Sequence, residues 1–246
     1  MLKKIKLRCL LLLQSAAFFS ILFLHCGQRD NMKSDKNDYS LLRKKMVEDQ
    51  ISSRGVKDPN VIQAMLKVPR HLFVPESEQR SAYWDTPLPI GYNQTISQPY
   101  IVAFMTEQLK VKPGDRILEI GTGSGYQAAV LAEIADSVFT IEIVSELAEQ
   151  SKKRLTDLQY DNVFVKYGDG YHGWPEKAPF DRIIITAAPP KIPPLLLEQL
   201  KAGGKMILPV GEYVQELVVV NKTESGMDMQ NVLPVRFVPM TGEIQE

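Results

Sequence analysis

The chain has 246 residues, of which 44% are hydrophobic and 24% charged, a composition that can bury the core of an enzyme-sized domain. Lysine plus arginine and aspartate plus glutamate number 29 each, so the formal charge is zero and no basic excess indicates nucleic-acid binding. Both cysteines lie within the first 26 residues, and the three histidines are scattered. We therefore expect no nucleic-acid partner, no metal site and no catalytic thiol in the folded part of the chain.

The first 26 residues resemble an export signal. Basic residues precede a largely apolar run that ends at Leu24, and His25 and Cys26 follow. This is the layout of a secretory signal with a cysteine at the position that lipoprotein processing acylates. His25 stands where a small residue is expected, which disfavours processing. A polar linker follows at 27–38, and it contains Met32, an alternative start of translation that would omit the signal.

Residues 39–246 read as a single domain, whose first part (39–110) is helical and then irregular. Two amphipathic stretches predict helices, the second of them beginning after a capping Asp58. The irregular stretch that follows shows neither helix nor strand periodicity, so we expect a long loop that carries a function. Within this loop we expect Trp84 and Tyr92 to serve as anchors that pack into the core, with stacking on the substrate as the alternative.

The run RILEIGTGSGY opens the second part of the domain (111–246). A short apolar strand has an acidic residue near its end, and three closely spaced glycines lead into an amphipathic helix. Glycine suits such a turn because it accepts positive φ angles and lets a ligand approach the backbone. A carboxylate beside the ligand repels a phosphate but suits a cation, and S-adenosylmethionine carries a sulfonium and an ammonium group. A tight turn without a ligand is the alternative. The cofactor-binding residues expected here are Glu119, Gly121, Thr122, Gly123 and Gly125.

The next two predicted strands also end in acidic residues. The strand at 137–143 ends near Glu142, which is placed to bind ribose hydroxyls, with a solvated strand end as the alternative. The strand at 162–168 runs into Asp169 and Gly170. We expect this aspartate to accept a hydrogen bond from an adenine amino group, although Asp-Gly alone is only a turn signal.

Strands and helices alternate from residue 116 onward. This order predicts an α/β fold with a mostly parallel sheet and helices on both faces, preceded by a short helical N-terminal region. Ligands of such sheets bind at the carboxyl ends of the strands. The remaining predicted strands are 181–186, a strand within 200–211, 215–222 and 233–239. Asp181 begins a buried strand, and we assign it no catalytic role.

Several motifs together resemble those of the protein-L-isoaspartate O-methyltransferase family. They are VPRHLFVP at 68–75, LPIGYNQTISQPYIVAFM at 88–105, LEIGTGSGY at 118–126, GDGYHGWPEKAPFDRIIITAA at 168–188 and LKAGGKMILPVG at 200–211. The resemblance extends over about residues 40–242. It implies a Rossmann-like class I methyltransferase fold, S-adenosylmethionine as cofactor and the free carboxylate of L-isoaspartyl residues as acceptor. The methyl ester then closes to a succinimide, whose hydrolysis restores part of the normal aspartyl linkages. Tyr92-Asn93 departs from the family pattern and puts details of the substrate loop in question.

Methylation of a carboxylate requires positioning rather than a strong base. The unperturbed pKa of a carboxyl group is about 4, so the acceptor is already ionised at neutral pH. Its oxygen must lie in line behind the methyl–sulfur bond in a water-poor pocket. The resemblance implies that Ser97 is the catalytic residue, with Thr95 and Gln98 as substrate-binding neighbours. From the residues alone, Ser97 suits the N-cap of the helix after it equally well.

Two other functions stay open at this point. One is a methyltransferase for another carboxylate or hydroxyl, and the other is an exported binding module that has lost activity. We expect a monomer whose partners are proteins or peptides that contain L-isoaspartyl residues.

Because S-adenosylmethionine is made in the cytoplasm, we expect a cytoplasmic location, reached through initiation at Met32 or through inefficient export. An exported lipoprotein with a membrane tether at Cys26 is the alternative.

Overall fold

The computed structural model describes residues 39–245. The predicted signal (1–26) and linker (27–38) lie outside the described residues, and with them Cys26 and Met32. From Tyr39 onward the chain forms a single structural unit. Among the described residues, no helix has both the length and the apolar character needed to cross a bilayer.

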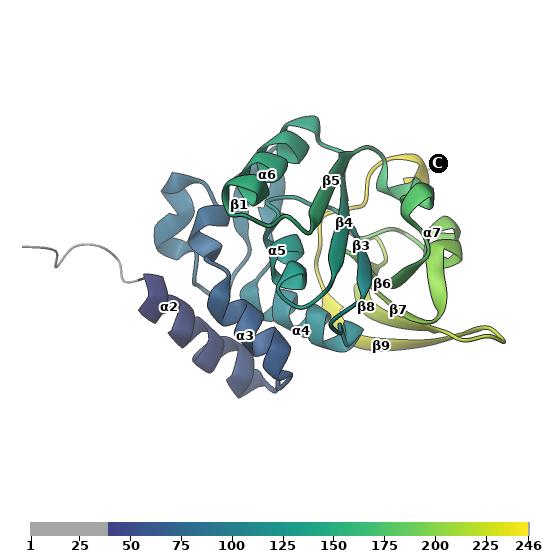
Figure 1. Cartoon of the computed structure of the whole chain (residues 1–246), viewed down its shortest axis with the longest axis horizontal. Helices are drawn as coiled ribbons and strands as arrows, with labels where there is room; N and C mark the ends of the chain where they lie inside the picture. The colour runs from purple at the N-terminus through teal and green to yellow at the C-terminus, as the bar shows by residue number, and fades with distance from the viewer. Residues whose placement is uncertain (1–38, 246) are drawn as a thin grey trace, which may run out of the picture. The chain divides into compact units, whose positions relative to one another are not determined.

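A seven-stranded sheet in the order β5-β4-β3-β6-β7-β8-β9 lies at the centre of this unit (Figure 1). Strands β3 to β7 run parallel to one another, and β8 and β9 are antiparallel to their neighbours, which confirms the predicted mostly parallel sheet. The strands are β3 (Arg116–Ile120), β4 (Ser137–Glu142), β5 (Val163–Tyr167), β6 (Phe180–Ile185), β7 (Leu200–Val210), β8 (Gln215–Lys222) and β9 (Met227–Val235).

Strand β9 begins earlier than the predicted strand 233–239 and ends earlier as well. Its first half, from Met227 to Asn231, is exposed, so no alternation of apolar residues marks it in the sequence. Pairing with β8 places it in the sheet, beginning with Met227 opposite Lys222. Residues 236–239 leave the sheet and continue toward the carboxyl ends of the parallel strands.

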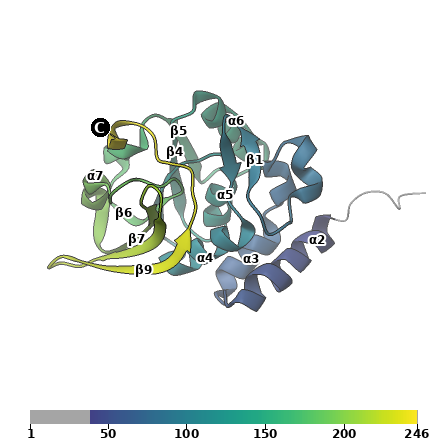
Figure 2. The same cartoon turned by 180° about the vertical axis from the view of Figure 1, so that it is seen from behind.

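Helices cover both faces of the sheet, as predicted. Helices α4 (Pro99–Leu109), α5 (Tyr126–Ala132) and α6 (Ser145–Asp157) lie on one face, and α7 (Pro194–Gln199) lies on the other (Figures 1 and 2). Strand side chains alternate between the two faces. Ile117, Val138 and Ile184 pack on the first face, whereas Leu118, Phe139 and Ile183 pack with Leu196 of α7 on the second. Burial on both faces explains why these strands read as continuous apolar runs.

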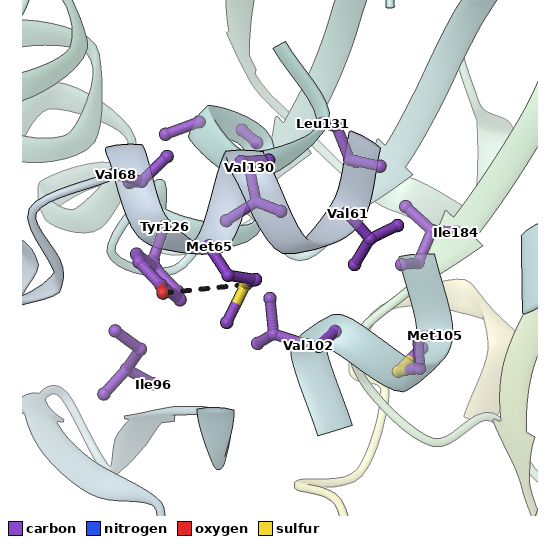
Figure 3. Close-up of a cluster of buried hydrophobic side chains, with 14 of the residues drawn as sticks. Val61, Met65, Val68, Ile96, Val102, Met105, Tyr126, Val130, Leu131 and Ile184 are labelled. Carbon is purple, nitrogen blue, oxygen red and sulfur yellow. Dashed lines mark hydrogen bonds between the residues drawn. The ribbon is translucent and has the colours of Figure 1, made fainter. Parts of the chain in front are cut away.

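The predicted N-terminal helices are present. The first consists of α2 (Tyr39–Lys45), a π-helical η1 (Met46–Ile51) and a 3₁₀ turn η2 (Ser52–Arg54). The second, α3 (Pro59–Lys67), is capped by Asp58, whose Oδ1 accepts a hydrogen bond of 2.8 Å from the Asn60 N–H. Figure 3 shows Met65 of α3 packed among Val102 of α4 and Val130 of α5, which joins this helix to the main core.

The predicted long loop before α4 is largely structured, so that expectation was wrong in part. It contains the 3₁₀ turns η3 (Arg70–Phe73) and η4 (Glu76–Ser81) and the hairpin of β1 (Leu88–Gly91) and β2 (Gln94–Ile96). Tyr92 and Asn93 form the hairpin turn with φ angles of 53° and 57°, the left-handed conformation that a type I′ turn requires. The two strands have only four and three residues, too few to give a clear period-2 pattern in the sequence.

The predicted anchors of this segment were also wrong. Trp84 is 62% exposed and Tyr92 is 47% exposed, so neither packs into the core. The hairpin is instead fixed by the smaller side chains Leu88, Ile90 and Ile96, which are buried. The remaining short 3₁₀ turns are η5 (Gly170–His172), η6 (Pro175–Lys177) and η7 (Glu243–Gln245).

Candidate active site

A pocket lies over the glycine turn between β3 and α5, at the carboxyl ends of the parallel strands. We term it the glycine-turn pocket. The predicted cofactor residues that line it are Gly121, Gly123, Glu142 and Gly170. Residues 238–241, which follow β9, form another wall together with Thr95 and Thr186. The site is thus where the rule for parallel sheets places it.

The three glycines of the turn have φ angles of 94°, 50° and 87°, all in the left-handed region. A Cβ at Gly121 would overlap the Thr186 hydroxyl, which donates hydrogen bonds to the carbonyls of Ile120 and Gly121. A Cβ at Gly125 would lie 3.1 Å from Leu155, outside the pocket lining. Gly121 and Gly125 are therefore also required for close packing against neighbouring side chains. At Gly123, by contrast, a Cβ would meet only Ile90, at 3.4 Å.

Glu142 joins the end of β4 to the glycine turn. Its Oε2 accepts a hydrogen bond of 2.7 Å from the Gly123 N–H, and its Oε1 accepts one of 3.0 Å from the Val144 N–H. Glu142 is only 5% exposed, so the alternative interpretation as a solvated strand end is wrong. Each carboxylate oxygen has a further lone pair, which leaves Glu142 able to accept hydrogen bonds from ligand hydroxyls.

Glu119 lies behind the glycine turn and does not line the pocket. The residue is fully buried, and neither carboxylate oxygen has a hydrogen-bond partner among the described residues. Burial raises the pKa of its carboxyl group to about 8; the polar Thr140 on β4 opposes this rise and the Glu142 carboxylate adds to it. Thr122 is also buried, with its hydroxyl 2.7 Å from that of Thr140.

Asp169 is engaged with the protein rather than open to the pocket. Its Oδ1 accepts a hydrogen bond from the Tyr171 N–H, and its Oδ2 accepts one of 2.9 Å from the Glu243 N–H. The contact with Glu243 holds the C-terminal segment in place next to residues 238–241, which line the glycine-turn pocket. Asp169, His172 and Glu243 also bring ligand atoms within 4.8 Å of one another, a spacing that could hold a metal ion.

Gly170 does line the pocket, and a Cβ there would overlap Ile120.

A second pocket adjoins the first, and we term it the serine pocket. It is lined by the three predicted substrate residues Thr95, Ser97 and Gln98, and by residues 234–238. Arg236 is the one charged side chain among the described residues that line it. Thr95 and Thr186 line both pockets and also a small hollow that contains Ser97, Thr122 and Gly123. The predicted substrate and cofactor residues therefore meet at this shared wall.

Ser97 is not the N-cap of α4. The N-cap is Gln98, and no side chain forms a capping hydrogen bond there. The Ser97 hydroxyl makes no hydrogen bond to another described residue, so it is available to a ligand. The N-cap alternative from the sequence was wrong because the helix begins one residue later than Ser-x-Pro suggests.

Thr186 was missed by the sequence analysis. It follows β6 directly and lines every pocket described above. The signal that could have found it is a hydroxyl residue at the carboxyl end of a buried parallel strand, the same rule that selected Glu142. The contribution of residues 238–241 had no such signal, because only the path of the chain after β9 brings them here.

Residues 41–245 match the sequence model of the family described as protein-L-isoaspartate(D-aspartate) O-methyltransferase. The chain belongs to this family. It is 56% identical over 201 residues to the protein-L-isoaspartate O-methyltransferase of Picosynechococcus sp., covering 82% of this chain and 90% of that one. A solved protein-L-isoaspartate O-methyltransferase structure matches with a TM-score of 0.77 and 30% identity over 82% of this chain and 67% of the other. A Plasmodium falciparum member, solved with S-adenosyl-L-homocysteine, matches with a TM-score of 0.71 and 27% identity over 84% of this chain and 99% of that one.

In this member of the protein-L-isoaspartate O-methyltransferase family, we expect Glu142→Ala to weaken S-adenosylhomocysteine binding by about 1.5–3 kcal/mol, the range for a charge-assisted hydrogen bond. The variant lacks the carboxylate that accepts the Gly123 N–H. We expect binding to weaken because the proposed contact with the ligand is lost and because the glycine turn is held less firmly. Calorimetric titration measures the loss. Glu146→Ala, an exposed carboxylate in the first turn of α6, is the matched control and should bind normally. A loss for Glu142→Ala no larger than that of the control would contradict the assignment.

We also expect Glu119 to make the stability of the free protein depend on pH. Below about 4.5 the folded and unfolded chains both hold its proton; between about 4.5 and 8 only the folded chain does. Stability is therefore lost as the pH rises through this window, by at most about 1.4 kcal/mol per pH unit. Glu119→Gln removes the titrating group, so its stability relative to wild type should rise from pH 5 to pH 8. Urea unfolding at both ends measures this, with exposed Glu149→Gln as control. A pH-independent difference would refute it.

Proposed function

We propose that this chain transfers the methyl group of S-adenosylmethionine to the free carboxylate of L-isoaspartyl residues in damaged proteins and so initiates their repair. The observation that carries the proposal is the wall of Thr95 and Thr186 shared by the glycine-turn and serine pockets. A donor on the glycine turn and an acceptor at Ser97 would meet at this wall. Family membership and the S-adenosylhomocysteine complex of the Plasmodium falciparum relative support the same reading.

The glycine-turn pocket fits the cofactor chemically. Its floor is backbone at Gly121 and Gly123, where no Cβ atom keeps a ligand away. Glu142 offers a fixed carboxylate suited to the hydroxyls of a ribose, and its charge suits a cationic ligand. S-adenosylmethionine, when bound, supplies a methyl group on a sulfonium centre. We propose that Gly121, Gly123, Glu142 and Gly170 contact the cofactor, while Glu119, Thr122, Gly125 and Asp169 shape the pocket from behind.

The serine pocket fits a carboxylate acceptor. The Ser97 hydroxyl is without a protein partner among the described residues and can donate a hydrogen bond to one carboxylate oxygen. Thr95 offers a second hydroxyl at the shared wall. Arg236 adds a positive charge that attracts an anionic substrate. A lone pair of the carboxylate forms the new carbon–oxygen bond as the methyl–sulfur bond breaks, so no proton has to be transferred and no general base is required.

A methyl-transfer assay tests the proposal directly. We expect the purified protein to methylate a peptide that contains L-isoaspartate and to leave the identical peptide with normal aspartate unmodified. The two peptides differ only in which carboxyl group is free, so the comparison isolates the acceptor. Equal transfer to both peptides, or transfer to neither, would contradict the proposed function.

We further propose a cytoplasmic location, because the cofactor is made in that compartment. We also propose that the active protein is a monomer. Mass spectrometry of the native N-terminus after cell fractionation tests the location, and light scattering tests the oligomeric state. We expect the main species to start at Met32 or to keep an unprocessed N-terminus in the soluble fraction. A diacylated Cys26 in the membrane fraction would overturn the proposed location.

A further inference from the structure

We propose that Arg70 is a positioning residue for the transfer reaction, holding the backbone of Ser97 at a fixed place relative to the glycine turn. The inference rests on the proposed function, because it concerns the same site. Arg70 lies in η3, within the VPRHLFVP motif, and does not line either pocket. Its effect on the reaction is therefore transmitted through the residues that it contacts.

The guanidinium of Arg70 joins two separate segments through their carbonyl groups. Its Nη2 donates a hydrogen bond of 2.8 Å to the Ser97 carbonyl, and its Nε donates one of 2.7 Å to the Ala82 carbonyl. The planar guanidinium carries donors in a fixed geometry, so the two carbonyls are held at a defined separation. Fixing the Ser97 carbonyl restricts the backbone on which the Ser97 hydroxyl is mounted.

The same guanidinium contacts the helix that carries the glycine turn. Its Cζ lies 4.8 Å from the ring centroid of Tyr126, the residue directly after Gly125. Figure 3 shows the Tyr126 ring with its hydroxyl directed at Met65, and Ile96, the neighbour of Ser97, on the same side of the cluster. Arg70 thus contacts Ser97 in one direction and the beginning of α5 in the other. Ser97 and Tyr126 line the same small hollow.

Stability alone is a poor account of this arginine. Arg70 is fully buried. Among the described residues, no carboxylate forms an ion pair with its guanidinium, and its Nη1 has no hydrogen-bond partner. Burial lowers the pKa of its guanidinium to about 10, which still leaves it charged at neutral pH. Asp85 attracts this charge, but its ion pair is with Arg54. A buried cation without an ion-pair contact is costly, and an apolar side chain of similar size would pack at lower cost. Behind Ser97, however, the charge attracts the carboxylate that the reaction requires.

Conservative variants separate positioning from packing. Arg70→Lys keeps a positive charge but offers a single point donor, which cannot hold both carbonyls in the same geometry. We expect kcat to fall at least about tenfold, while the Kd for S-adenosylhomocysteine stays within about twofold of wild type. Arg70→Met removes the charge as well, so we expect an additional rise in KM for the isoaspartyl peptide.

Phe73→Leu provides the matched structural control. Phe73 lies on the same 3₁₀ turn, is fully buried and packs against the same Tyr126 ring, 5.5 Å between centroids, but makes no hydrogen bond to Ser97. We expect this variant to melt at a lower temperature and to keep kcat within about twofold of wild type when assayed well below melting.

Chemical rescue adds a second readout: methylguanidinium should restore part of the kcat of Arg70→Ala, and methylammonium should not.

Two results would overturn the inference. One is a folded Arg70→Lys with wild-type kcat, and the other is a Phe73→Leu variant whose kcat falls as far as that of Arg70→Lys. In either case Arg70 would have no role beyond packing. Transfer by the wild-type protein to the isoaspartyl and aspartyl peptides, measured in the same series, tests the proposed function separately.

Discussion

Gly123→Val is expected to weaken binding of S-adenosylhomocysteine at least about 100-fold, equivalent to about 2.7 kcal/mol. Gly123 has a φ of 50°, a conformation that is unfavourable for any residue with a Cβ and more so for a β-branched one. The residue lines the glycine-turn pocket, so the added methyl groups would also occupy the space in which we propose that the cofactor binds. Its N–H donates to Glu142, and a displaced turn would release that carboxylate as well. Calorimetric titration measures the loss.

Gly114→Val is the matched control for backbone strain. Gly114 has a φ of 89° in the turn before β3, and a Cβ there would meet no atom within 4 Å. We expect this variant to lose stability and to bind S-adenosylhomocysteine normally. If Gly123→Val folds and binds as tightly as wild type, the glycine turn is a structural turn and the cofactor lies elsewhere.

Ser97→Ala is expected to reduce methyl transfer more than about tenfold, with S-adenosylhomocysteine affinity within about twofold of wild type. The Ser97 hydroxyl lines the serine pocket without a partner among the described residues, so its loss removes a contact to the acceptor. Because Gln98 and not Ser97 caps α4, we expect little change in melting temperature. Steady-state kinetics and thermal unfolding of the same preparations give both quantities.

The exposed Ser225, in the turn between β8 and β9, provides the matched serine control. Ser225→Ala should retain full activity and stability. Wild-type turnover by a folded Ser97→Ala would remove the catalytic assignment and return this serine to a purely structural part of the loop.

The sequence by itself determined the parallel part of the sheet and the glycine turn. The strand Arg116–Ile120 was predictable because burial on both faces makes it mostly apolar, with Ile117, Leu118 and Ile120. The glycines after it were predictable because positive φ angles select glycine. The position of Glu142 at the pocket was predictable because ligands of parallel sheets bind at the carboxyl ends of the strands, and Glu142 is the last residue of β4. The motifs around Ser97 were specific enough to indicate the family.

Only the tertiary structure decided how these residues are arranged. Glu119 and Asp169 are adjacent in sequence to the turn and to a strand end, yet the fold directs one carboxylate into the core and the other onto the C-terminal segment. Thr186 and residues 238–241 enter the site through strand order and the path after β9, which are long-range properties without a local pattern. The same holds for Arg70, whose contacts with Ser97 and Tyr126 join segments far apart in the chain. Local periodicity reports which side of an element is buried, whereas the partners that meet at a site depend on the packing of the whole domain.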